Sequence, residues 1–334
     1  MRNIFISKII PVYNGLSNGL PKCLDSIWVQ SLNKDLYEVI CIDDCSTDST
    51  RSWLKRQQEE HDNLVVIENE KNIRQGGARN KGVRAARGKY ICFIDQDDYY
   101  HKESISDVYN HLKNNDLEIL IVDCAYQYPG VESNKLQHNF PHREVMTGDE
   151  QIERNSIPYA PWKFIFLKSL VIDNNLFFAE NERIEDVDWV HILTHHARRT
   201  QYQPILFIHY NKTTVSTTMT SYKSPETIYS TLRVGKRLIE LTETTFENSN
   251  DNVKRYIRNL GERMYHLGLR NYFFFYANIK YKTQHIKDTA DDVIGHSFLV
   301  KVAKRFPKTF SIVSNLMSPF GIFAMWLYRT IKYR

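Results

Sequence analysis

The sequence lacks the features of several large protein classes. No segment reaches the about 18 uninterrupted apolar residues of an ordinary transmembrane helix. The five cysteines include no CxxC pair, which argues against a zinc site. No basic run with interleaved aromatic residues predicts a nucleic-acid surface. The apolar stretch near the N-terminus is short and interrupted by Ser7 and Lys8, so we expect no secretory signal.

What is present is typical of a large globular protein. The chain has 334 residues, with 42% hydrophobic and 25% charged residues and a net charge of +5. This length predicts one large catalytic domain with an appendage. Three cysteines, Cys41, Cys92 and Cys124, lie in apolar runs where cysteine acts as a small hydrophobe. This use of cysteine suits a reducing cytosol.

The first 125 residues alternate between strand and helix patterns. We expect strands at 4–12, 37–42, 64–68, 90–94 and 117–122, and helices at 20–30, 50–60, 75–87 and 104–114. This order predicts a mostly parallel sheet with helices on both faces. Ligands of such sheets bind at the carboxyl edge, and Asp43, Asp44, Asp95 and Asp97 all follow predicted strands.

The rest of the chain gives a weaker pattern. Residues 126–160 read as irregular apart from a turn into a short helix at 147–150. Residues 184–198 read as a helix, and the chain from Pro225 onward reads as mainly helical. A stripe with helical spacing predicts core packing, and it consists of Val253, Ile257, Leu260, Met264 and Leu267.

Two acidic pairs could carry chemistry. The segment Asp95-Gln96-Asp97 has the D-x-D pattern that can hold Mg²⁺ or Mn²⁺ together with substrate phosphates. A solvated acidic turn is the alternative. The pair Asp43-Asp44 is suited to hydrogen bonds from a base or a ribose, or else to capping the following turn.

Three further groups of residues have open interpretations. Arg79 lies in a glycine-rich segment that is neither a Walker A loop nor G-x-G-x-x-G, and it either contacts a diphosphate or packs within a helix. One of the carboxylates Glu185, Asp186 and Asp188 could be a general base, or all three could form a charged helix start. For the i,i+4 pair His191 and His195, a structural role is favoured over a metal site.

Taken together, these motifs resemble glycosyltransferase family 2. The resemblance rests on four segments in register, Pro11-Val12-Tyr13-Asn14, Asp43-Asp44-Cys45-Ser46, Gly76-Gly77-Ala78-Arg79 and Asp95-Gln96-Asp97-Asp98, and on Glu185-Asp186 at the place of the family's ED pair. It extends over residues 4–215. One departure is Cys45, which stands where the family usually has glycine.

The resemblance implies a GT-A fold, a Rossmann-like α/β sheet, and transfer of a sugar with inversion. The expected donor is a nucleoside-diphosphate sugar, with UDP favoured, and the expected acceptor is a hydroxyl of a glycan or lipid-linked glycan in surface polysaccharide synthesis. The resemblance assigns donor contacts to Pro11, Tyr13, Asn14, Asp43, Asp44, Arg79, Asp95 and Gln96. It also makes Asp97 the ligand of Mn²⁺ or Mg²⁺, and Asp186 the catalytic base.

These expectations divide the chain into three parts. Residues 1–215 form the catalytic domain, with a nucleotide-sugar half at 1–125 and an acceptor half at 126–215. Residues 216–292 form a helical extension, and 293–334 form a basic and apolar tail. The tail is either a membrane-surface segment or a helix packed on protein. We therefore expect a cytoplasmic protein, or one held peripherally at the inner face of the membrane.

Two other functions fit parts of the sequence. A nucleotidyltransferase would need a basic phosphate loop near the N-terminus, and residues 16–20 lack one. A catalytically silent nucleotide-binding scaffold would not need both Asp97 and Asp186, so their joint presence favours an enzyme.

Overall fold

The computed structural model describes residues 3–212 and 224–275, which fall into two compact units. The first unit contains the described residues up to 212 together with Thr244–Tyr256. The second contains helix α9 (Pro225–Leu241) and the part of helix α10 (Asp251–Phe275) that begins at Ile257. The predicted tail at 293–334 and the Ser/Thr-rich segment at 213–218 lie outside the described residues.

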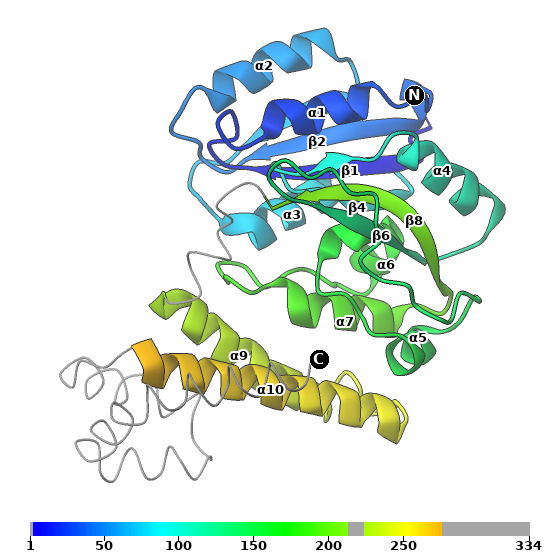
Figure 1. The fold of residues 1–334 in the computed structure, drawn as a ribbon, viewed down its shortest axis with the longest axis vertical. Coiled ribbons are helices and arrows are strands. Elements are labelled where there is room, and N and C mark those ends of the chain that lie inside the picture. Colours follow the sequence, from blue (N-terminus) through cyan, green and yellow to red (C-terminus); the bar gives the residue numbers. More distant parts are fainter. Residues whose placement is uncertain (1–2, 213–223, 276–334) are drawn as a thin grey trace. The chain divides into compact units, whose positions relative to one another are not determined.

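The first unit is built on one sheet (Figure 1). Its strand order is β3-β2-β1-β4-β7-β6-β8-β5. Its strands are β1 (Ile6–Val12), β2 (Tyr37–Asp43), β3 (Leu64–Glu68), β4 (Tyr90–Phe93), β5 (Tyr99–Tyr100), β6 (Ile119–Gln127), β7 (Phe164–Leu167) and β8 (Thr200–Asn211). Only β7 and β5 pair antiparallel to their neighbours. The prediction of a mostly parallel sheet is therefore confirmed.

Topology brings distant residues to one edge of this sheet. Strands β1, β2 and β4 are parallel to one another, and β6 has the same direction because β7 is antiparallel to both β4 and β6. Strand β8 runs parallel to β6. The segments that follow these strands therefore meet at a shared carboxyl edge, which is where ligands of open α/β sheets bind.

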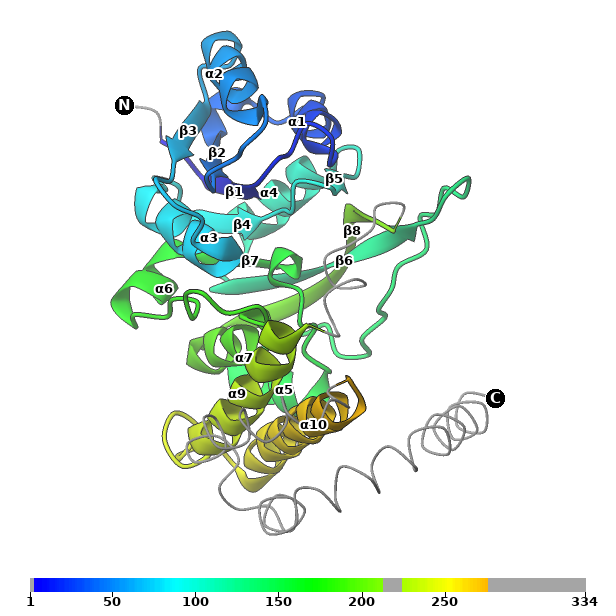
Figure 2. The same ribbon diagram turned by 90° about the vertical axis from the view of Figure 1, so that its left-hand side faces the viewer.

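Helices cover both faces of the sheet (Figure 2). They are α1 (Leu20–Trp28), α2 (Thr50–Glu60), α3 (Arg74–Ala85), α4 (Ser104–Asn114), α5 (Gly148–Arg154), α6 (Lys168–Asp173) and α7 (Asp186–His196), with 3₁₀ turns η1 (Lys34–Leu36) and η2 (Pro161–Lys163). Helix α3 lies so close to β1 that a Cβ atom on Gly82 would be 2.4 Å from Ile9 Cγ2. Trp189 of α7 stacks on Phe178 and meets the edge of Phe93 from β4. These contacts fix α3 and α7 on the same side of the sheet.

The structure also differs from the sequence-based expectation. The bounds of α2, β3 and α4 agree with it, but β5, β7 and β8 were not expected. Within the 126–160 region, β6 extends beyond its expected end to Gln127. The short helix expected after 147–150 is α5, which begins with a capping box between Thr147 and Glu150. The sequence pattern did not predict strand β8, because its buried residues do not alternate with exposed ones. Register shifts interrupt its pairing with β6.

The apolar stripe predicted to pack in the core is buried only in part. Val253, Ile257 and Leu260 are buried, whereas Leu267 is 37% exposed. Within the second unit, α9 and α10 cross closely at glycines, since a Cβ atom on Gly235 would be 2.5 Å from the Tyr265 nitrogen. None of the helices in the described ranges is long and apolar enough to span a bilayer.

The core of the sheet contains a buried lysine. Lys8, in the middle of β1, is fully buried, and its Nζ has no hydrogen-bond partner among the described residues. The Nζ atom lies 3.4 Å from the centroid of the Tyr37 ring. Burial lowers the pKa of Lys8 to about 7, although the nearby Cys92 raises it slightly. The folded state therefore disfavours the charged form of this side chain.

We predict that Lys8→Met stabilises the protein by up to about 4 kcal/mol at pH 7, because a pKa shift of this size costs about 1.4 kcal/mol per unit. The pKa of Lys8 is lower in the folded than in the unfolded state. The free energy of unfolding of the wild type therefore rises as the pH increases from about 7 to 10.5, the ordinary pKa of lysine. Urea unfolding across this range is the measurement, with exposed Lys113→Met as the control. Equal pH slopes for wild type and Lys8→Met would contradict the prediction.

Candidate active site

A glutamine side chain ties the end of β1 to the D-x-D segment. The Tyr13 nitrogen donates to Gln96 Oε1 at 2.9 Å, and Gln96 Nε2 donates back to the Tyr13 oxygen at 3.0 Å. Gln96 therefore holds the backbone beside its neighbours Asp95 and Asp97. The Tyr13 side chain is left 45% exposed at this edge.

Asn14 joins the β1 loop to the loop after β2. It adopts a left-handed backbone with φ 47°, which asparagine tolerates better than most residues. Its nitrogen donates to Ser46 Oγ at 2.9 Å, and its Oδ1 accepts from the Thr47 nitrogen at 2.8 Å. The predicted nucleotide-side residues on these two loops are thus brought together.

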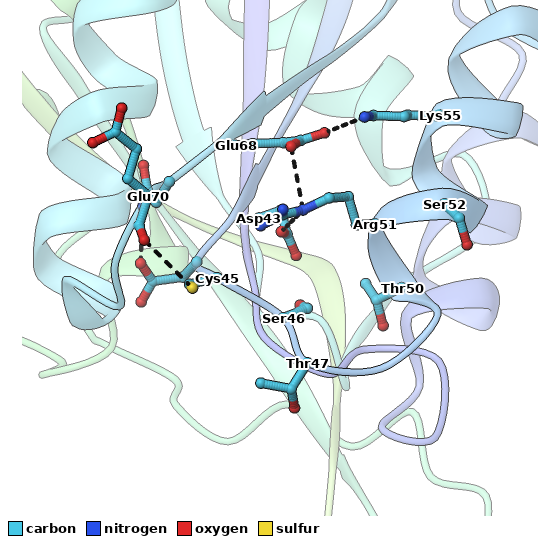
Figure 3. Close-up of polar contacts among 12 residues, drawn as sticks. Asp43, Cys45, Ser46, Thr47, Thr50, Arg51, Ser52, Lys55, Glu68 and Glu70 are labelled. Carbon is cyan, nitrogen blue, oxygen red and sulfur yellow. Dashed lines mark hydrogen bonds and ion pairs between the residues drawn. The ribbon is translucent and has the colours of Figure 1, made fainter.

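The carboxylate of Asp43 belongs to a charged network on the side of α2. Its Oδ2 accepts from Arg51 Nε at 3.1 Å, and Arg51 also pairs with Glu68, which in turn pairs with Lys55 (Figure 3). Asp43 is fully buried, and its Oδ1 has no hydrogen-bond partner among the described residues.

Asp44 holds the segment that leads into α3. Its Oδ1 accepts from Asn69 Nδ2 and from the Ile73 nitrogen, both at 2.8 Å, and its own backbone oxygen accepts from Asn72 Nδ2 at 3.1 Å. Sequence reasoning missed Asn69 and Asn72 as partners, because an asparagine in a loop has many uses. Both acidic residues of the pair therefore build the loops that follow β2 at the carboxyl edge.

Arg79 connects the two acidic motifs of the site. From α3, its Nη2 lies 2.8 Å from Asp95 Oδ1, and its Nη1 lies 2.8 Å from Glu185 Oε1. Its side chain is only 2% exposed. Burial lowers the pKa of Arg79, but Asp95 and Glu185 more than offset this, and the net shift is upward. A buried guanidinium thus brings the D-x-D and ED segments to one place.

The ED pair has perturbed acidity. Burial raises the pKa of Glu185 to about 7, with Asp186 and Asp95 adding to the rise and Arg79 opposing it. Burial likewise raises the pKa of Asp186 to about 6, against the pull of Arg79. Asp186 is the first residue of α7 and is partly exposed. A carboxylate with a pKa near 6 can accept a proton at neutral pH more readily than an ordinary one.

The D-x-D turn continues into a buried acid. Burial, followed by Asp95 and Asp97, raises the pKa of Asp98 well above its ordinary value. Its Oδ1 accepts from the Asn211 nitrogen at the end of β8 at 2.8 Å. Asp98 therefore attaches this turn to β8, a role that the D-x-D pattern alone did not indicate.

The carboxylates fit a divalent ion that is shared with substrate phosphates. In the described parts of the chain, no group of three or more His, Cys, Asp or Glu side chains is arranged as a complete metal cage. Asp97 and Asp95 are both partly exposed, although Asp95 Oδ1 is engaged by Arg79. Magnesium commonly uses only one or two carboxylates with water and phosphate oxygens, so this donor set is sufficient for such a site.

The two histidines of α7 have structural partners. His191 Nδ1 lies 2.6 Å from the Val187 oxygen, and burial lowers the pKa of His191 to about 4. His195 Nδ1 lies 2.6 Å from Asp149 Oδ1 of α5. Ser249 Oγ is 3.4 Å from the same nitrogen of His195, so these three side chains lack the relay geometry of a serine–histidine–aspartate triad, in which the two partners use different ring nitrogens.

Comparison with known proteins places these motifs in a family. Residues 7–175, half of the chain, match the family described as "Glycosyl transferase family 2". The poly(ribitol-phosphate) beta-glucosyltransferase of Bacillus spizizenii is 42% identical over 35% of this chain. The poly(ribitol-phosphate) beta-N-acetylglucosaminyltransferase TarS of Staphylococcus aureus is 28% identical over 52% of it. The matches cover only 18% and 29% of these two relatives.

Solved structures share the fold. A fragment of S. aureus TarS in complex with UDP-GlcNAc aligns over 95% of this chain and 92% of its own, with a TM-score of 0.62 at 19% identity. A mannosyltransferase from Pyrobaculum calidifontis in complex with GDP-Man and Mn²⁺ aligns over 95% and 87%, with a TM-score of 0.52 at 13% identity. The predicted GT-A fold is confirmed.

We predict that Arg79→Met destabilises the protein by about 3 to 5 kcal/mol, because it leaves the buried Glu185 and the partly exposed Asp95 without their counter-charge. Urea unfolding measures the loss. The matched control is Arg154→Met, which removes a half-exposed arginine from its pairs with Glu144 and Glu150 and should change stability little. Equal stability of Arg79→Met and the wild type would show that the bridge contributes nothing.

Proposed function

Because the chain belongs to glycosyltransferase family 2, we propose that it transfers a sugar, with inversion, from a UDP-sugar to an acceptor hydroxyl. Membership confirms the predicted family and the predicted enzyme class. The donor, the stereochemistry, the acceptor and the residue roles are our proposals. The observation that carries them is the Arg79 bridge, because it gathers the D-x-D and ED motifs at the carboxyl edge of the sheet.

Displacement with inversion needs a base and a leaving group on opposite sides of the anomeric carbon. We assign the base to Asp186, because its raised pKa suits proton transfer near neutral pH and because it begins a helix separate from the D-x-D turn. Asp186 takes the proton of the acceptor hydroxyl as the oxygen attacks. Holding the two reactants in this arrangement supplies much of the rate enhancement.

The leaving diphosphate lies on the side of Asp97 in this proposal. Asp97, with the remaining oxygen of Asp95, would hold Mn²⁺ or Mg²⁺, and the bound ion would offset the negative charge that develops on the diphosphate. Arg79 is best described as a positioning residue, since its buried terminal nitrogens are already bonded to Asp95 and Glu185. A direct contact between Arg79 and the donor stays a prediction.

The nucleotide end of the donor would lie along the β1 loop. Pro11, Tyr13 and Asn14 border the base and ribose, and Asp44 binds the base with Asp43 nearby. The exposed Tyr13 ring supports this assignment, because an aromatic face suits a flat base. The complexes of TarS with UDP-GlcNAc and UDP support uridine as the nucleoside.

The names of the relatives favour one acceptor class. Both are poly(ribitol-phosphate) glycosyltransferases, and we propose a phosphate-linked polyol chain of a surface polysaccharide as the acceptor. A cytoplasmic protein with its tail on an anionic membrane surface is consistent with such a substrate, and that membrane contact stays a prediction. Liposome flotation of the full chain and of a chain ending at Gly295 tests the membrane contact. Equal flotation of the two chains would exclude the tail as the membrane-binding segment.

We predict that release of UDP from a UDP-sugar requires Mn²⁺ or Mg²⁺ and is lost in Asp97→Ala. A panel of UDP-, GDP-, CDP- and dTDP-sugars tests which nucleobase the donor carries. Asp116→Ala, at an exposed position, is the control. Wild-type activity in Asp97→Ala would contradict the metal assignment. Nucleotide binding without any turnover under all metals would favour a silent scaffold.

We also predict a pH dependence of transfer. Because the base acts when deprotonated, kcat/KM should fall as pH drops below about 6, the pKa of Asp186, and should level off above about 7. Asp186→Asn should reduce transfer by about 10²- to 10⁴-fold and remove this pH dependence. Donor binding by Asp186→Asn should be close to that of the wild type. An unchanged pH profile in Asp186→Asn would exclude Asp186 as the base.

A further inference from the structure

Three aromatic rings of the predicted acceptor half contact one another in succession, and Tyr128 lies close by in the chain. We call the four residues the aromatic track: Trp162, Tyr210, Tyr126 and Tyr128. The rings of Trp162 and Tyr210 are nearly parallel, at 17°, with centroids 5.6 Å apart. Tyr210 and Tyr126 are also 5.6 Å apart, and their backbones pair directly between β8 and β6. Tyr128 follows two residues after Tyr126, just beyond the end of β6.

The aromatic track begins beside the D-x-D turn. Asn211, the residue after Tyr210, donates its nitrogen to Asp98, which directly follows Asp97. Burial raises the pKa of Tyr210, and the charges of Asp98, Asp95 and Asp97 raise it further, which agrees with this proximity. Trp162 lies at the same edge, because it precedes β7, which is antiparallel to β6.

The other end of the track is open to solvent. Trp162 is 7% exposed, Tyr126 and Tyr210 are half-buried, and Tyr128 is 51% exposed. Tyr128 is held in a tight turn by two backbone hydrogen bonds with Val131. The track therefore leads from the D-x-D turn toward the surface, with two successive ring separations of 5.6 Å.

The side chain of Lys212 lies beside two of the rings. Lys212 Nζ lies 4.4 Å from the centroid of Tyr210 and 4.9 Å from that of Tyr126. The Lys212 nitrogen donates to the Gln127 oxygen at 2.8 Å, so its backbone is fixed at the end of the strand pair. Aromatic faces with a neighbouring cation suit a chain that alternates C–H surfaces with negative groups.

We propose that the aromatic track and Lys212 bind the acceptor chain, a phosphate-linked polyol or sugar polymer, and guide its hydroxyl toward Asp186. This inference rests on the proposed function. Carbon-bound hydrogens of successive units lie on Tyr126, Tyr210 and Tyr128, and Lys212 faces a linking phosphate. Trp162 supports Tyr210 from the protein side.

The test separates acceptor binding from donor binding. The full chain, Tyr126→Ala and Lys212→Gln are assayed for UDP release without acceptor and for transfer to purified poly(ribitol phosphate). We expect KM for the polymer to rise about tenfold in Tyr126→Ala, equivalent to about 1.4 kcal/mol, with donor KM and acceptor-free UDP release within about twofold of the wild type. In Lys212→Gln, we expect polymer binding to lose much of its sensitivity to salt.

Matched variants exclude a merely structural effect. Tyr126→Phe and Tyr128→Phe keep the rings and should keep the polymer KM, whereas Tyr128→Ala, at an exposed position, should raise it without affecting folding. Unchanged polymer KM in both alanine variants would overturn the proposal, as would a parallel rise in donor KM. If the wild type releases UDP but shows no binding of the polymer by calorimetry, the track proposal fails while the proposed function stands. If it neither binds nor turns over any nucleotide sugar, the proposed function itself fails.

Discussion

The active site depends on one buried cation. Arg79 is almost fully buried, and its two terminal nitrogens bond carboxylates from segments that follow different parts of the sheet. Burying a charge is costly unless it is paired and hydrogen-bonded, so the guanidinium and its carboxylates stabilise one another only in this arrangement. The fork of an arginine can hold two carboxylates in fixed directions, which a lysine would not do.

The surrounding loops follow from this constraint. Gln96 fixes the turn beside Asp95, Asn14 joins the loops after β1 and β2, and Asp98 attaches the turn to β8. Each contact uses a side chain to satisfy backbone groups that no strand pairs. The edge of the sheet is therefore a network of specific hydrogen bonds. Beside it, burial raises the pKa of Glu185 and the pKa of Asp186.

The sequence predicted the parallel half of the fold and the positions of the motifs, because buried strands and their polar ends are local signals. The strand pattern alone placed Asp43 and Asp95 at one edge of the sheet, whereas Asp186 was assigned to the same site only through the family resemblance. The bridge from Arg79 to Glu185 was not predictable from spacing, since no local pattern states which of several carboxylates an arginine will meet. Strand β8 was missed for a related reason, because its partner β6 lies far away in sequence and register shifts blur the alternation that marks a strand.

The separation of Arg79 and Glu185 in the chain has a consequence for synthesis. The two residues are 106 positions apart, so a growing chain completes strands β1 to β4 long before helix α7 exists. Such distant contacts form late in folding, because the intervening loop must close first. A partly made chain holds Arg79 and Asp95 without Glu185 or Asp186. Assembly of the Arg79 bridge is thus coupled to completion of the domain, and a chain still being synthesised cannot yet form the candidate site.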